Sequence, residues 1–268
     1  MQCDDEKAPI ESFLKQLNRA TTAMLLLDYD GTLAPFQVNR DRAYPYPGII
    51  PILDKIIQSE RTRVVVISGR PVCELQTLLN PLKKIEIWGA HGQEHLFADG
   101  SYQSSEISSD ISGILAKAEE WMREAGLSRL VEIKPGGIAV HWRGLQDPEI
   151  ERVKIRIHKG WDSFASNPKL KFLNFDGGIE LRVARPNKGD AVSSLLEEAG
   201  PDTPIAFLGD DLTDEDAFRV LGERGFSVLV RPEYHETRAN AWLRPPQELI
   251  YFLQQWSKAL SKSHTDIS

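Results

Sequence analysis

The segment Met24-Leu25-Leu26-Leu27-Asp28-Tyr29-Asp30-Gly31-Thr32 decides the fold, because an apolar run ends abruptly at two acidic residues. Two more apolar runs also lead to polar residues. Val64-Val65-Val66-Ile67 is followed by Ser68, and Ile205-Ala206-Phe207-Leu208 is followed by Gly209 and then Asp210. Continuous apolar runs of this length are typical of strands that are buried on both faces of a parallel sheet. Apolar residues at helical spacing separate these runs. The alternation predicts an α/β fold with a Rossmann-like parallel sheet and helices on both faces.

The pattern changes in the middle of the chain. Two long helical stretches, 107–125 and 148–165, alternate there with paired strand candidates. These strand candidates are residues 130–134, 138–142, 171–175 and 179–183. Paired strands backed by two helices predict an α+β insert. We therefore expect a discontinuous core of residues 1–93 and 186–268, interrupted by an inserted α+β domain of residues 94–185.

Composition excludes several kinds of partner. The formal net charge is −7, from 32 basic and 39 acidic side chains, which argues against a nucleic-acid partner. The two cysteines, Cys3 and Cys73, form no C-x-x-C pair, so neither a zinc site nor a disulfide framework is indicated. The acidic start at residues 1–7 is unlike a signal peptide, and no apolar run is long enough to span a bilayer. We expect a cytoplasmic, soluble protein that binds no membrane.

Six polar residues far apart in sequence share one property: each follows a predicted strand or lies at the start of a core helix. They are Asp28, Asp30, Ser68, Lys188, Asp210 and Asp214. In an open parallel sheet, ligands bind in the crevice beyond the carboxyl ends of the strands. We therefore expect these six side chains to gather at one edge of the core sheet.

Each of these residues also has an ordinary structural interpretation. Asp28 and Asp30 alone suit a turn as well as a catalytic pair. Ser68 alone would be read as a helix N-cap, and Lys188 as a surface lysine. The second acidic run, Gly209 to Asp216, changes the balance, because so much adjacent negative charge is costly without a cation. Oxygen ligands beside phosphate suit Mg²⁺, so the pattern favours a magnesium-dependent site for an anionic substrate.

At this point the residues resemble a known group of enzymes. Asp28-x-Asp30-Gly31-Thr32, Ser68, Lys188 and Gly209-Asp210-x-x-x-Asp214 resemble the four motifs of the haloacid dehalogenase (HAD) superfamily, in the expected order. Within it, the chain is similar to the trehalose-6-phosphate phosphatase family. The segments that carry this likeness are Val66-Ile67-Ser68-Gly69-Arg70, His91-Gly92-x-Glu94, Val131-Glu132-x-Lys134, His141-Trp142-Arg143, Glu180-x-Arg182 and Gly209 to Phe218.

The resemblance implies a role for each motif residue. Asp28 would attack phosphorus to form an aspartyl-phosphate, and Asp30 would act as the acid and then the base. Ser68 and Lys188 would bind the phosphoryl oxygens. Mg²⁺ would be held by the Asp28 carboxylate, the Asp30 backbone carbonyl and Asp210, with Asp214 acting through water or in support. The implied reaction is hydrolysis of a phosphate monoester, trehalose 6-phosphate, to trehalose and inorganic phosphate.

The resemblance also makes the insert a C2-type cap that closes over the crevice and selects the substrate. Glu132, Lys134 and Glu180 would bind sugar hydroxyls, with His141 and Arg143 as weaker candidates. Arg70, in the Ser68 motif, is counted with the substrate-binding residues. Without the resemblance, the five insert residues would be read as solvated charges on an exposed sheet face.

Several alternatives remain open at this stage. The same chemistry suits another glycosyl phosphate, of the glucosylglycerol- or mannosylglycerate-type. A sugar phosphomutase shares the Asp-x-Asp-Gly-Thr motif. A non-catalytic sugar-phosphate sensor is disfavoured, because every catalytic position keeps a competent side chain. We expect a monomer whose partner is a small sugar phosphate.

Overall fold

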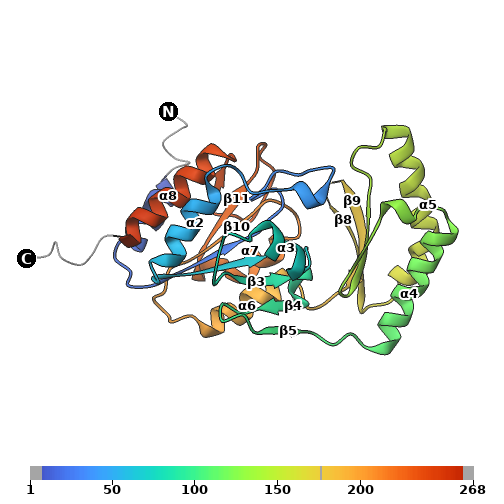
Figure 1. The fold of residues 1–268 in the computed structure, drawn as a ribbon, viewed down its shortest axis with the longest axis horizontal. Coiled ribbons are helices and arrows are strands. Elements are labelled where there is room, and N and C mark those ends of the chain that lie inside the picture. The colour runs from blue at the N-terminus through green and yellow to red at the C-terminus, as the bar shows by residue number, and fades with distance from the viewer. Residues whose placement is uncertain (1–7, 176, 262–268) are drawn as a thin grey trace, which may run out of the picture. The chain divides into compact units, whose positions relative to one another are not determined.

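The computed structural model describes residues 8–175 and 177–261. The chain divides into two compact units, Met1–Gln103 with Lys188–Ser268, and Ser104–Asn187. We call them the core unit and the insert unit (Figure 1). Cys3 and residues 1–7, on which the expectation of no signal peptide rests, lie outside the described residues.

The core unit is built on an eight-stranded sheet of order β12-β11-β10-β1-β2-β3-β4-β5. Its strands are β1 (Ala23–Leu27), β2 (Thr62–Ile67), β3 (Glu86–Gly89), β4 (Glu94–Leu96), β5 (Tyr102–Ser104), β10 (Ile205–Gly209), β11 (Phe226–Val230) and β12 (Ala241–Leu243). Every pairing from β12 to β3 is parallel. The central strand β1 pairs with β2 on one side and with β10 on the other, so the order of connection reverses at β1. Such a switch point opens a crevice at the carboxyl ends of the strands.

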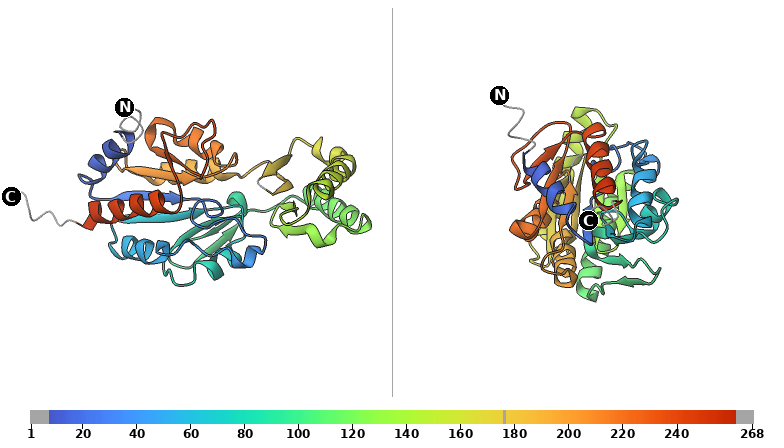
Figure 2. Two further views of the ribbon diagram at one scale, coloured as in Figure 1. Left: turned by 90° about the horizontal axis from the view of Figure 1, so that it is seen from above. Right: turned by 90° about the vertical axis from the view of Figure 1, so that its left-hand side faces the viewer.

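Helices cover both faces of this sheet, as Figure 2 shows. One face packs against α1 (Ala8–Leu17), α2 (Ile49–Gln58), α3 (Val72–Leu78) and α8 (Gln247–Ser261), and the other against α6 (Lys188–Glu198) and α7 (Glu215–Leu221). Side chains of β1 alternate between the two cores: Leu25 and Leu27 pack with the first group, Met24 and Leu26 with the second. This two-residue period explains why the whole strand is apolar.

The edge of the core sheet differs from the prediction. The insert was expected to begin at Glu94, but β4 pairs antiparallel with β3 and β5 lies beside β4, so both belong to the core sheet. The turn predicted at Asp99-Gly100 is confirmed, with Gly100 at φ +88°. Strand β12 was not predicted, because three residues carry too little periodicity. Short 3₁₀ turns lie at Arg40–Arg42, Ala90–Gly92, Ser128–Leu130 and Gly222–Arg224.

The insert unit has a four-stranded antiparallel sheet of order β6-β7-β9-β8, with two helices. Its elements are α4 (Ser109–Glu124), β6 (Val131–Lys134), β7 (Gly137–His141), α5 (Asp147–Ala165), β8 (Leu170–Phe175) and β9 (Gly178–Val183). Both helices pack on one face, against Ile138, Val140, Ile179 and Leu181 (Figure 1). Because side chains alternate along a strand, the residues between these apolar ones point to the other face.

The predicted fold class is therefore confirmed: a parallel α/β core is interrupted by an α+β insert. No helix in residues 8–175 or 177–261 combines the length and apolarity needed to cross a bilayer.

Candidate active site

Three of the predicted residues follow neighbouring strands of the core sheet. Asp28 follows β1, Ser68 follows β2 and Asp210 follows β10. The register aligns these ends, because Leu27 pairs with Val66 and also with Leu208. All three side chains are at most 3% exposed. The topology thus brings them to one sheet edge, as the sequence predicts.

Lys188 links the two halves of the core at this edge. It is the first residue of α6 and is buried. Its Nζ lies 2.6 Å from Asp28 Oδ1 and 2.7 Å from Asp214 Oδ1. Burial alone would lower the pKa of the Lys188 ammonium, but Asp214 and Asp28 offset this and hold that pKa above its ordinary value. Lys188 is therefore a permanently charged counter-ion and not a surface lysine.

Three buried carboxylates, Asp28, Asp210 and Asp214, form one cluster in which a ligand atom from each lies within 4.8 Å of the others. We call them the acidic cluster. Burial raises the pKa of Asp28 to about 7, with Lys188 opposing the rise and Asp214 adding to it. Burial also raises the pKa of Asp210 well above its ordinary value, and the charges of Asp28 and Asp214 contribute further. Full ionisation of the three carboxylates would exceed the charge of Lys188, and the repulsion between them is one reason why the pKa values of Asp28 and Asp210 are raised.

The acidic cluster fits a divalent cation. Asp210 Oδ2 is buried and accepts no hydrogen bond from the described residues; the Arg231 guanidinium stands 3.8 Å away. Gly31 makes room for this oxygen, because a Cβ atom at Gly31 would lie 2.1 Å from it. Gly31 also has φ +81°, a conformation that glycine adopts at little cost. A hard cation among oxygen ligands would occupy the lone pairs and remove the repulsion.

Asp214 is the most constrained member of the acidic cluster. It stands at the N-cap of α7 and is fully buried. Its Oδ2 accepts hydrogen bonds from the backbone N–H groups of Asp210 and Asp211, both at 3.1 Å. Its other oxygen binds Lys188. With both oxygens engaged, Asp214 shapes the loop that carries Asp210.

Ser68 lies in a tight turn and is not a helix cap. Helix α3 begins at Val72, with Pro71 at its N-cap. The Ser68 hydroxyl accepts a hydrogen bond from the backbone N–H of Arg70 at 3.2 Å, and the Ser68 N–H donates to Trp88 O at 2.9 Å. These bonds hold the hydroxyl at the end of β2, where the sequence places a phosphate ligand.

Asp30 has a counter-ion of its own. Arg70 Nε donates to Asp30 Oδ2 at 2.7 Å, and Nη2 donates to Oδ1 at 2.8 Å. The two acidic residues of the opening segment are thus separated, since Asp28 binds Lys188 and Asp30 binds Arg70. The spacing alone does not reveal this division.

In the insert unit, the predicted sugar-binding residues lie on the sheet face opposite the helices. Lys134 Nζ lies 3.1 Å from Glu180 Oε1 and 3.7 Å from Glu132 Oε2. His141 Nε2 lies 2.7 Å from Glu132 Oε2. These four residues form what we call the insert cluster. The Arg143 side chain packs against Gly177, beside Gly178, which pairs with His141 of the insert cluster.

The sequence analysis does not name Arg231, and it quotes Thr32 and Arg182 in motifs without giving them a role. Arg231 follows β11 directly, and its Nη1 donates to the Asp210 carbonyl at 3.2 Å. The buried Thr32 hydroxyl lies 3.5 Å from Asp28 Oδ2. Arg231 could have been found by the strand-end rule that identified Asp210, because it occupies the corresponding position after the next strand. In the insert, Arg182 shares the face of Glu180 and is also buried.

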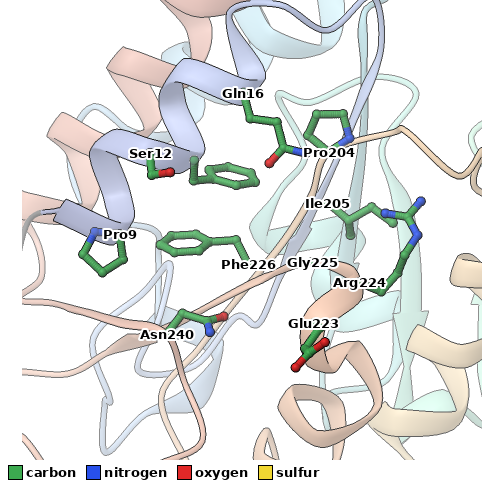
Figure 3. Close-up of a pocket in the computed structure, with 11 residues that line it drawn as sticks. Pro9, Ser12, Gln16, Pro204, Ile205, Glu223, Arg224, Gly225, Phe226 and Asn240 are labelled. Atoms are coloured by element: carbon green, nitrogen blue, oxygen red, sulfur yellow. The ribbon is translucent and has the colours of Figure 1, made fainter.

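A separate cavity of about 320 Å³ lies at the other end of the core strands (Figure 3). Phe13, Ile205 and Phe226 help to line it. Ile205 begins β10, whereas Asp210 follows the end of the same strand. The cavity therefore does not belong to the acidic cluster.

Solved structures share this fold. The C. albicans trehalose-6-phosphate phosphatase C-terminal domain superimposes with a TM-score of 0.82 at 22% identity, covering 93% of this chain and 96% of that one. A haloacid dehalogenase-like hydrolase from B. subtilis gives a TM-score of 0.58 at 15% identity, covering 87% and 99%. These likenesses define the class of fold: a parallel α/β core that is interrupted by an α+β insert.

Sequence comparison narrows this class to a family. A model of the trehalose-phosphatase family matches residues 26–246. An Arabidopsis thaliana protein, probable trehalose-phosphate phosphatase C, is 29% identical over 88% of this chain and 78% of its own length. The trehalose-phosphate phosphatase of Mycobacterium tuberculosis (strain H37Rv) is 29% identical over 82% of this chain and 56% of its own length. The chain belongs to the trehalose-phosphatase family, so the resemblance first seen in its motifs is confirmed.

Proposed function

We propose that this protein hydrolyses trehalose 6-phosphate to trehalose and inorganic phosphate, in trehalose biosynthesis, through a phosphorylated Asp28. One observation carries the proposal. In a chain of the trehalose-phosphatase family, Asp28 directly follows the central strand, its Oδ1 is bound to a buried lysine, and two further buried carboxylates lie beside it. That arrangement suits an anionic nucleophile that must approach an anionic phosphate.

The proposed reaction has two steps. In the first, a carboxylate oxygen of Asp28 attacks phosphorus, the bond from phosphorus to the sugar oxygen breaks, and Asp30 gives its proton to that oxygen. In the second, water attacks the phosphorus of the aspartyl-phosphate, Asp30 takes the proton from this water, and the bond from Asp28 to phosphorus breaks. Acid–base assistance of this kind accelerates a reaction about 10²–10⁴-fold.

Lys188 and Ser68 stabilise the charge that spreads over the phosphoryl oxygens in both steps. Lys188 is already desolvated and held by two carboxylates, so little reorganisation is needed when phosphate arrives. Magnesium, held by the Asp28 carboxylate, the Asp30 backbone carbonyl and Asp210, with Asp214 in support, would supply the further positive charge that lets the two anions meet.

We propose that the insert unit, Ser104–Asn187, serves as the substrate-specificity cap, which the sequence analysis expects at residues 94–185. Its candidate sugar ligands are Glu132, Lys134, His141, Arg143 and Glu180. Charged side chains form the stronger hydrogen bonds to hydroxyl groups, and a disaccharide presents many hydroxyls. The insert cluster supports this role, because it holds acceptors and donors side by side on one sheet face.

We further propose Mg²⁺ as the cation, the cytoplasm as the compartment and a monomer as the working unit. The oxygen-only donor set of the acidic cluster supports the choice of a hard cation. The low cysteine content supports a reducing compartment.

The decisive experiment measures phosphate release from a panel of sugar phosphates in the presence of Mg²⁺. Trehalose 6-phosphate is expected to have the highest kcat/KM. A clear preference for a glucosylglycerol- or mannosylglycerate-type phosphate would overturn the substrate assignment but keep the chemistry. An isomeric sugar phosphate formed without phosphate release would identify a mutase. Binding without turnover would identify a sensor.

A further inference from the structure

Arg70 binds Asp30 through two parallel hydrogen bonds, of 2.7 and 2.8 Å. The guanidinium therefore fixes the position of the Asp30 carboxylate and also the orientation of its plane. Arg70 is 2% exposed, whereas the Asp30 side chain is 28% exposed. The arginine thus lies behind the carboxylate, and the carboxylate keeps access to its surroundings.

Arg70 is itself anchored by a third nitrogen. Its Nη1 donates to Glu74 Oε2 at 3.0 Å, and the same oxygen accepts a hydrogen bond from Arg40 Nη2 at 3.3 Å. The guanidinium also lies over the ring of Tyr29, 5.6 Å from the centroid. Glu74 on α3 and Tyr29 in the opening segment therefore constrain the Arg70 side chain directly, and Arg40 binds the same Glu74 oxygen.

We propose that Arg70 is a positioning residue that orients the carboxylate of Asp30 for both proton transfers, and that Glu74 in turn orients Arg70. The inference rests on the proposed function and gives Arg70 a role other than binding substrate. All three guanidinium nitrogens already donate to carboxylates, and little of the side chain is exposed. A carboxylate oxygen has two lone pairs, so each Asp30 oxygen can still exchange a proton while bound by Arg70.

Both proton transfers depend on the orientation of Asp30. In the first step, its proton must lie on the line to the sugar oxygen as the bond from phosphorus to that oxygen breaks. In the second, the same carboxylate must face the attacking water. Misplacing a reacting group by about 1 Å can lower a rate about 10²-fold. Lysine at position 70 would keep the positive charge but could not form two parallel bonds.

The core unit offers a matched control. Arg63 makes the same type of double contact with Glu86, through Nε at 2.7 Å and Nη2 at 2.9 Å. Arg63 lies within β2, whereas Arg70 follows the end of that strand. An effect of losing any partly buried arginine–carboxylate pair would appear in both Arg63→Lys and Arg70→Lys. An effect on Asp30 would appear in Arg70→Lys alone.

The experiment compares two substrates that differ in their need for an acid. A sugar phosphate has a poor leaving group that requires protonation, whereas p-nitrophenyl phosphate does not. For Arg70→Lys with trehalose 6-phosphate, kcat is expected to fall about 10²-fold, with KM changed less than about threefold. With p-nitrophenyl phosphate, bond cleavage is spared but water activation is impaired. Phosphorylated Asp28 should therefore accumulate, giving a nitrophenolate burst larger than that of the unsubstituted enzyme.

Glu74→Gln gives a second and milder test, because Arg70 remains but loses its anchor. It should show the same pattern with a loss of about tenfold in kcat. Arg63→Lys should leave kcat and the burst unchanged. Thermal unfolding of each variant verifies the fold. If Arg70→Lys does not fold, the kcat and the burst of Glu74→Gln test the proposal in its place.

Two results would overturn the proposal. A large rise in KM at unchanged kcat would make Arg70 a substrate ligand. An equal loss on both substrates without a larger burst would make it a structural residue. Failure of the proposed function is distinguishable, because it appears in the unsubstituted enzyme: if that enzyme prefers another sugar phosphate, the Arg70 comparison is made with that ester.

Discussion

The acidic cluster of the core and the insert cluster are both groups of charged side chains, but the first is buried, the second is mostly half-buried, and different geometries assemble them. In the core, Asp28 and Asp210 each follow the end of a parallel strand. In the insert, Glu132 and Glu180 lie within antiparallel strands, on either side of Ala139. A parallel sheet therefore gathers functional groups at its edge, whereas an antiparallel sheet gathers them on its face.

The two clusters also differ in their balance of charge. In the core, three carboxylates face two cations: Lys188 binds Asp28 and Asp214, and the Arg231 guanidinium lies 3.8 Å from Asp210. In the insert, Glu132 and Glu180 contact both Lys134 and the neighbouring His141 or Arg182. The core cluster thus calls for an additional cation, and the insert cluster does not. This difference agrees with the proposed roles: phosphate chemistry in the core and sugar recognition in the insert.

The largest effect should come from Asp28→Asn. This variant keeps the shape of the side chain but removes the nucleophile, so kcat is expected to fall by at least about 10⁴-fold. An uncharged amide suits a buried and crowded site, so the thermal unfolding midpoint should stay the same or rise. Residual turnover within tenfold of the unsubstituted enzyme would show that Asp28 is not the nucleophile.

Removal of Mg²⁺ should lower catalysis at the acidic cluster of the core unit. Chelation with EDTA is expected to lower phosphate release about 10³-fold, because the repulsion between Asp28 and phosphate is no longer offset, and added Mg²⁺ should restore it. Mg²⁺ should also raise the unfolding midpoint of the unsubstituted protein but not of Asp210→Asn. Equal stabilisation of both proteins would show that Asp210 is not a ligand.

Removal of a charge from the insert cluster should act on binding and not on chemistry. Glu180→Gln is expected to raise KM for trehalose 6-phosphate by about 10–100-fold, because a charge-assisted hydrogen bond is lost. Turnover of p-nitrophenyl phosphate, which has no sugar, should not change. The exposed Glu151, paired with Lys154 on α5, provides the control Glu151→Gln, which should leave both substrates unaffected. A matching loss with p-nitrophenyl phosphate would contradict the division of roles.

The smallest expected effect is on stability, from removing the charge of Glu86, which binds Arg63 and His95 in the core unit. Burial alone would raise the pKa of Glu86, but hydrogen bonds from His95 and Arg63 hold that pKa below its ordinary value. Glu86 therefore stabilises the fold above the pKa of an unfolded glutamate, about 4.3, and this contribution is lost as the pH falls further. Glu86→Gln should cost about 1–3 kcal/mol at pH 7 and less at pH 3, measured by urea unfolding. A cost that does not depend on pH would contradict the pKa shift.

Most of the fold could be read from the sequence, because it depends on local patterns. The apolar runs before Asp28, Ser68 and Asp210 are strands in the structure, and the helices predicted at 107–125 and 148–165 are α4 and α5, within two residues of those bounds. The predictions failed where a strand is too short to show a pattern, or where its pattern suits either of the two sheets. Strand β12 has three residues, and the hairpin after β3 could have belonged to either sheet until its pairing was known.

The sequence by itself determined the type of site, because carboxylates that follow apolar strands must converge at one edge of a parallel sheet. It also determined the family, through motifs that extend over most of the chain. Only the tertiary structure assigned separate counter-ions, Lys188 to Asp28 and Arg70 to Asp30. These pairings join residues 160 and 40 positions apart, and side-chain rotamers and loop geometry select them. No local pattern in the chain encodes that choice.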